Sequence, residues 1–138
     1  MQQISSILEK FGTEARIWVF VSNRQLTPNE QTIATEEIIN FANNWQTHGK
    51  EMTATGFLFA KQALVLVANE SELKASGCSI DKINHLIKAL GAQFNINFFD
   101  RMTTLVLDQD QWIASAFNPN ETRPVISAAT QDISDFLI

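Results

Sequence analysis

The sequence has little of what disulfide-stabilised, membrane-spanning and nucleic-acid-binding proteins require. It holds a single cysteine, Cys78, so no disulfide can form within the chain. Its longest apolar run, residues 63–68, is far shorter than the roughly 20 residues that span a bilayer. Acidic residues outnumber basic ones by 15 to 10, and no cluster of lysine or arginine offers the basic face that nucleic acids bind. We therefore expect neither a membrane nor a nucleic acid as partner.

Motifs of common enzymes and cofactor sites are missing as well. The sequence contains no G-x-x-x-x-G-K-[ST], no G-x-G-x-x-G and no G-x-S-x-G, so a P-loop ATPase is excluded. The single cysteine and two widely separated histidines have none of the spacings of a zinc site, and we expect no metal and no cofactor. The first residues lack the basic start and apolar core of a signal peptide, so we expect the protein in the cytoplasm.

What is present is the composition of one globular domain, residues 1–138, with 45% hydrophobic and 18% charged residues. Periodicity and turn residues predict helices near residues 3–11, 28–47 and from about 79, and strands near residues 16–21, 55–60, 63–68, 98–108 and 112–117. Lys61-Gln62 and Gln109-Asp110 are expected to close two β-hairpins between successive strands. Thr27 before Pro28, with Glu30 after them, is a capping-box pattern for the second helix. A further short helix is expected near residues 131–137.

Apart from the first helix and the C-terminal segment, these elements follow the order β-α-β-β-α-β. That order is typical of the ferredoxin-like, split βαβ fold, in which right-handed crossovers place both helices on one face of a single antiparallel sheet. The first and third strands are then central, which suits the two most apolar strands, residues 16–21 and 63–68. We predict an α+β domain of this kind with an added N-terminal helix and a C-terminal extension.

The most informative segment has the sequence SGCSIDK, residues 76–82, at the expected start of the last long helix. Free N–H groups and the positive end of the helix dipole favour an anion there, and they favour a thiolate at Cys78. Small residues, Ser76, Gly77 and Ser79, let a ligand approach the backbone, whereas the carboxylate of Asp81 opposes a second negative charge. The structural alternative makes Ser79 the N-cap, Asp81 the complement of the dipole and Cys78 a small buried residue.

A partner for Cys78 is predicted from the helix that precedes the hairpin, which closes with Trp45-x-x-His48-Gly49. The two long helices are antiparallel in the predicted fold, so the end of one lies beside the start of the other and beside Arg16. We expect Cys78 and His48 to act as nucleophile and base, and Arg16 and Trp45 to bind a ligand. In the alternative interpretation, His48 contacts the last carbonyls of its helix and Trp45 lies in the core.

Four segments together resemble a small uncharacterised bacterial family whose members are about this length. They are RIWVF from Arg16, the Trp45–His48 element, SGCSIDK at residues 76–82, and FDR at residues 99–101. The resemblance covers residues 16–107, and SGCSIDK is its most specific part. Members are sometimes labelled "ABC transporter ATPase", a label that conflicts with the missing Walker motif. The family implies no activity or ligand, but it links the tryptophan–histidine element to the cysteine segment.

Two functions from different classes remain open. In the first, the protein binds a small anionic ligand or acts through the Cys78 thiol, with His48 as its partner. In the second, it is a non-catalytic binding or assembly module. The predicted helices cover one face of the sheet, so an exposed apolar face would need covering by the terminal segments or by a second subunit in a homodimer.

Overall fold

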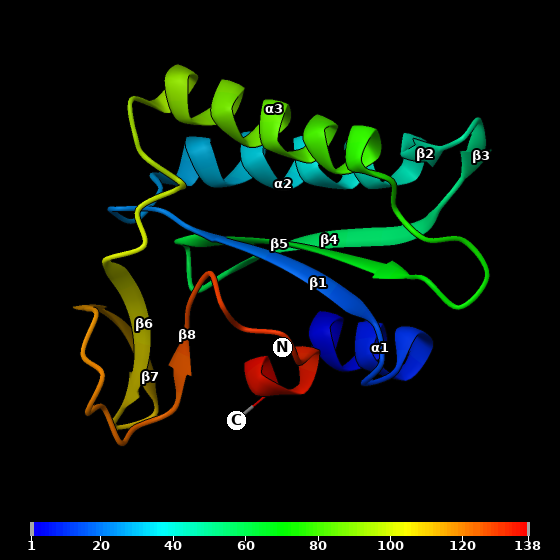
Figure 1. The fold of residues 1–138 in the computed structure, drawn as a ribbon. Coiled ribbons are helices and arrows are strands. Elements are labelled where there is room, and N and C mark those ends of the chain that lie inside the picture. The colour runs from blue at the N-terminus through cyan, green and yellow to red at the C-terminus, as the bar shows by residue number, and fades with distance from the viewer. Residues whose placement is uncertain (1, 138) are drawn as a thin grey trace.

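The computed structural model describes residues 2–137 and is drawn as a ribbon in Figure 1. The elements in chain order are α1 (Gln2–Phe11), β1 (Arg16–Val21), α2 (Pro28–Asn44), β2 (Gln46–Thr47), β3 (Lys50–Glu51), β4 (Thr53–Phe59), β5 (Ala63–Asn69), α3 (Gly77–Phe94), β6 (Thr103–Asp108), β7 (Gln111–Ala116), β8 (Val125–Ile126) and the 3₁₀-helix η1 (Ile133–Leu137). All the strand pairs described are antiparallel. The α+β class expected from the sequence is therefore confirmed.

The central layer is the sheet β1-β5-β4, in which β5 is the middle strand and is buried on both faces. One face packs against α2 and α3, and its side chains include Leu64 and Leu66. The opposite face packs against α1 and η1, whose Ile7 and Phe136 are buried there. Figure 1 shows the two long helices on one side of this sheet and the two terminal helices on the other. Of the two coverings that the sequence left open for this face, the terminal segments or a second subunit, the structure shows the terminal segments.

Both predicted hairpins are confirmed, and left-handed turn residues close them. β4 and β5 are joined through residues 60–62, of which Ala60 and Lys61 have φ angles of 53° and 60°. β6 and β7 are joined through Gln109 and Asp110, with φ angles of 49° and 65°. Two successive residues with positive φ give a turn the twist that matches the right-handed twist of the strands, so each link returns the chain into register.

The fourth strand expected beside β1 lies elsewhere. β6 pairs with β7 on one side and β8 on the other, and these strands form a separate small sheet, at the lower left of Figure 1. Leu105 and Val106 of β6 are buried by the other strands of this small sheet and by the core of the protein. The ferredoxin-like arrangement is not confirmed, because the strands are divided among several small sheets. As a consequence, no strand among residues 2–137 is hydrogen-bonded to the outer edge of β1.

The helices differ from the prediction at three places. α2 begins as expected, with a complete capping box between Thr27 and Glu30, but it ends at Asn44. β2 and β3 pair directly after it, and His48 and Gly49 form their turn with φ angles of 52° and 75°. α3 begins at Gly77, earlier than expected, and the predicted C-terminal helix is the short 3₁₀-helix η1.

Candidate functional site

The start of α3 is held by serine and threonine hydroxyl groups. Ser76, and not Ser79, is the N-cap: its hydroxyl oxygen accepts the N–H of Ser79 at 3.1 Å. Ser79 is 2% exposed, and its own hydroxyl donates to the Ser76 carbonyl at 2.8 Å. The N–H of Ser76 donates to the hydroxyl oxygen of Thr47 in β2 at 3.1 Å. Asp81 lies beyond the first helical turn, which has no acidic residue, so the predicted complement to the dipole is wrong.

A row of aromatic contacts connects this helix start to β1. The indole N–H of Trp45 donates to the Ser79 carbonyl at 2.9 Å, and Trp45 is 2% exposed. The Trp45 ring meets the Trp18 ring edge-on, with 5.4 Å between the ring centroids. The Arg16 guanidinium lies 4.7 Å from the Trp18 ring centroid and forms an ion pair with Glu70 at 3.4 Å. Trp45, Ser79 and Arg16 therefore lie at one end of the sheet, and their polar groups are satisfied within the fold.

Cys78 and His48 have a different environment from the one expected. Cys78 is exposed at the second position of α3, and His48 is exposed in the β2–β3 turn, beyond the end of α2. Within residues 2–137, no hydrogen bond joins the thiol to the imidazole. Neither side chain is shielded from water. The arrangement provides an accessible thiol but no buried nucleophile–base pair.

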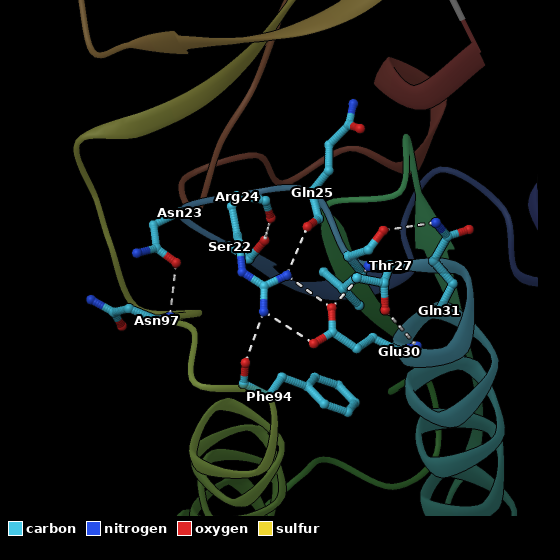
Figure 2. A network of polar contacts seen from close by, with 10 residues as sticks. Ser22, Asn23, Arg24, Gln25, Thr27, Glu30, Gln31, Phe94 and Asn97 are labelled. Atoms are coloured by element: carbon cyan, nitrogen blue, oxygen red, sulfur yellow. Dashed lines mark hydrogen bonds and ion pairs between the residues drawn. The ribbon is translucent and has the colours of Figure 1, made fainter.

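A polar network at the opposite end of the sheet ties three segments together (Figure 2). The Arg24 guanidinium donates to both carboxylate oxygens of Glu30, at 2.8 and 3.0 Å, and to the Phe94 carbonyl at the end of α3, at 2.8 Å. The hydrogen bond from Arg24, followed by that from the Thr27 N–H, lowers the pKa of Glu30 to about 2. The loop after β1 is thereby fixed to the start of α2 and to the end of α3.

Asparagine side and main chains fix the segment that leaves α3. The N–H of Asn97 donates to the Asn23 side-chain oxygen at 2.9 Å, and the N–H of Asn23 donates to the Asn97 carbonyl at 3.1 Å (Figure 2). Asp100 then accepts from the Thr103 hydroxyl at 2.8 Å and from the Met102 N–H at 2.9 Å. These bonds lower the pKa of Asp100. They direct the chain past the end of β1 into the second sheet.

A hollow of about 450 Å³ lies along the outer edge of β1. The residues that line it are Ile17, Trp18, Val19 and Phe20 of β1, Ile80, Asn84 and Lys88 of α3, residues 98–101 after α3, and Ala128. Aromatic surface is accessible here: Phe99 is 41% exposed, and its ring lies edge-on to that of Phe20 with 5.6 Å between centroids. We call this hollow the β1 groove.

The backbone N–H and C=O groups of successive β1 residues point alternately toward β5 and toward the groove. The N–H of Ser22 donates to the carbonyl of Gln62 at 2.9 Å, and this pair continues the β1–β5 register. Residues directly opposite each other exchange hydrogen bonds at every second position of an antiparallel ladder. Even-numbered residues of β1 therefore bond to β5, and Ile17, Val19 and Val21 direct their N–H and C=O groups outward. In the described chain, no bond from a loop or a side chain reaches those three residues.

Sequence reasoning placed no function on Asn84, Lys88 or Arg101. One signal was present, because Ile80, Asn84 and Lys88 recur at a spacing of four and so share one side of a helix. The decisive feature is the free edge of β1, which depends on where β6 finds its partners. A long-range pairing of that kind is not encoded in the local pattern of either strand.

Two further findings concern metal ligands and membrane-spanning helices. Within residues 2–137, no three His, Cys, Asp or Glu side chains gather closely enough to hold a metal ion. None of the helices described combines the length and the apolar character needed to cross a membrane.

Comparisons with known proteins found no match to any protein-family model and no significant match among curated proteins or solved structures. The resemblance carried by residues 76–82 and the three other segments stays a prediction. The functional assignment therefore depends on the geometry of this chain.

Proposed function

We propose that the protein is a non-catalytic binding module that takes up an extended segment of another protein along the β1 groove. The observation that carries the proposal is the unpaired edge, where Ile17, Val19 and Val21 offer backbone donors and acceptors beside the aromatic rings of Trp18 and Phe20. An added strand satisfies those groups and covers the apolar walls. The same position would hold the fourth strand of the predicted ferredoxin-like sheet.

The dimensions of the edge support this proposal. β1 has six residues and so extends for about 20 Å. A partner segment of similar length would place every second side chain toward α3, where Ile80 and Asn84 line the groove. Backbone hydrogen bonds would then supply affinity, and the α3 wall would select the alternate side chains.

The catalytic alternative has less support. Cys78 and His48 are exposed and unconnected, and Arg16 is paired with Glu70. Catalysis by a thiol generally relies on a base held within hydrogen-bonding reach and on restricted water access. A small-anion or thiol site at the start of α3 stays a prediction, and the labelling rate of Cys78 tests its thiol part.

The proposal is tested with a phage-displayed library of random heptapeptides, followed by fluorescence polarisation with the selected peptides in synthetic form. Ile17→Pro removes an outward N–H and places the proline ring at the groove, while the bonds from β1 to β5 stay intact. We expect this variant to bind at least about tenfold more weakly than the wild type. Circular dichroism establishes that the variant is folded.

The matched control is Ala114→Pro, on the free edge of β7 in the second sheet. The N–H of Phe117 donates to the Met102 carbonyl at 2.7 Å, so by the same alternation Ala114 faces outward. We expect this variant to bind like the wild type. Failure to select any peptide, or equal binding by folded Ile17→Pro, would refute the proposal. If Ile17→Pro does not fold, the amide hydrogens of Val19 and Val21 must exchange more slowly with peptide bound, or the proposal is wrong.

A further inference from the structure

We infer that the segment bound in the β1 groove carries a carboxylate, held between Lys88 and Arg101 at the Phe20 end of the groove. This inference rests on the proposed function and specifies the chemistry of the partner. It follows from the direction of the groove, the charges on its walls and the alternation of side chains along a strand.

The groove has two chemically different ends because α3 and β1 run in the same direction. At one end, Arg16 pairs with Glu70, and the Glu70 carboxylate also accepts the N–H of Ala75, just before α3. At the other end, Asn23 and Asn97 are joined just after β1 and α3. The early α3 residues Ile80 and Asn84 therefore lie toward Trp18. Lys88 and residues 98–101 lie toward Phe20, in agreement with the contact between the Phe20 and Phe99 rings.

The Phe20 end carries unpaired positive charge. Lys88 and Arg101 both line the groove and are exposed, and in residues 2–137 neither forms an ion pair. Asp100 is the acidic residue on the same wall; its oxygens accept bonds from Thr103 and Met102, and its negative charge leaves the two cations with a net charge of +1. An incoming carboxylate would therefore meet two available cationic donors, and such charge-assisted bonds are stronger than neutral ones.

Successive side chains of a strand point to opposite faces of the sheet, and this alternation predicts which position of the partner segment carries the carboxylate. Trp18 and Phe20 belong to the cluster on the α3 side of the sheet, whereas Val19 belongs to the opposite cluster. Partner residues that lie opposite Trp18 and Phe20 point to the α3 side as well, and they are two positions apart. We expect an apolar residue opposite Trp18, near Ile80, and an acidic residue opposite Phe20, near Lys88.

The same charges disfavour a second copy of this chain as the occupant. Two β1 edges that pair about a twofold axis bring the groove walls of both molecules together. Each molecule contributes its own Lys88 and Arg101, so like charges approach one another. An acidic extended segment of a different protein is favoured, and sedimentation distinguishes the two: a dimer that Ile17→Pro dissociates would contradict the inference.

The test uses four amidated probe peptides that carry a fluorophore at the N-terminus. Two place Asp two positions from a valine, Thr-Val-Thr-Val-Thr-Asp-Thr and its reversed sequence Thr-Asp-Thr-Val-Thr-Val-Thr, because the segment can run in either direction. The other two carry Asn in place of Asp. A fifth probe, Thr-Val-Thr-Val-Thr with a free C-terminus, tests whether a terminal carboxylate serves equally. We expect a carboxylate probe to bind at least about tenfold more tightly than its neutral counterpart, and less so at high salt.

Variants of the protein locate the effect. Lys88→Gln and Arg101→Gln are each expected to bring the preference for the carboxylate probe to within about threefold. Lys82→Gln removes an exposed lysine of α3 that does not line the groove, and it is expected to leave the preference unchanged. Two results overturn the inference and leave the proposed function standing. In the first, the Asp and Asn probes bind equally. In the second, no probe binds, although library peptides bind and Ile17→Pro weakens their binding. If no library peptide binds either, both are wrong.

Discussion

Replacing Glu30 with glutamine removes a negative charge from the network that fixes the loop after β1, and its cost can be worked out from the structure. The pKa of Glu30 is lowered from 4.5 to about 2, chiefly by the hydrogen bond from Arg24 and then by that from the Thr27 N–H. Each pKa unit corresponds to about 1.4 kcal/mol, so the full shift corresponds to about 3 kcal/mol. The Arg24 side chain is 41% exposed, and solvent screening reduces the expected loss to about 1–2 kcal/mol.

The sign of the pH dependence follows from the lowered pKa. A carboxyl that is more acidic in the folded protein stabilises it fully above the unfolded pKa of 4.5, and this contribution is lost as the pH falls toward about 2. We expect Glu30→Gln to be less stable than the wild type near neutral pH and to approach it in acid. Glutamine still accepts the Thr27 N–H, so the capping box is kept and the variant isolates the charge.

The measurement is urea unfolding followed by tryptophan fluorescence, at about pH 7, 5 and 3. The other acidic residues with a lowered pKa, Asp100, Glu121 and Asp132, are common to both proteins, so their contributions cancel when the two stabilities are compared. Glu37→Gln, an exposed glutamate on the same helix, is the control and is expected to cost less than about 0.5 kcal/mol. A cost for Glu30→Gln that is the same at pH 7 and pH 3 would show that the network does not act through this charge.

Two other predictions concern the start of α3. Trp45→Phe removes the indole N–H that donates to the buried Ser79 carbonyl, and we expect the free energy of unfolding to fall by about 1–3 kcal/mol. Trp112→Phe is the control, because Trp112 is half-buried and forms no such bond, and it should cost less. Equal losses for the two variants would count against the hydrogen bond. Cys78 is exposed, so we expect a maleimide to label the folded protein fully. His48→Ala should leave the labelling rate unchanged. Slower labelling of that variant would support the hypothesis that His48 activates the Cys78 thiol.

Features determined by neighbouring residues were predictable from the sequence. The capping box at Thr27 and the two hairpins depend on a few adjacent residues, and the structure contains all three. Trp45 was expected beside the start of α3, where its indole now meets Ser79. Ser79 was expected as the N-cap of α3, but Ser76 takes that place. Both are serines followed by helix-compatible residues, so the local sequence does not distinguish them. The N–H of Ser76 is bonded to Thr47, which is distant in the sequence, and this bond favours Ser76.

Features that depend on distant partners were not predictable. His48 was expected at a helix end, but the pairing of β2 with β3 stops α2 before it. β6 has the apolar pattern of a central strand whichever sheet it joins, and its pairing with Val125 and Ile126 depends on a segment with no strand signal of its own. The groove exists because of that pairing, so its residues could not be identified by inspecting the residues themselves.

The position of β1 in the sheet also has a consequence for how the chain folds. β4 and β5 are linked by a tight turn and can pair within microseconds, whereas β1 must close a long loop before Phe20 reaches Leu64. We therefore expect the hairpin to form first and β1 to dock on it together with the helices. Substitutions in the hairpin will chiefly slow folding, while those in β1 will chiefly accelerate unfolding. We therefore expect that the strand proposed to bind a partner is also the first strand to detach when the sheet unfolds.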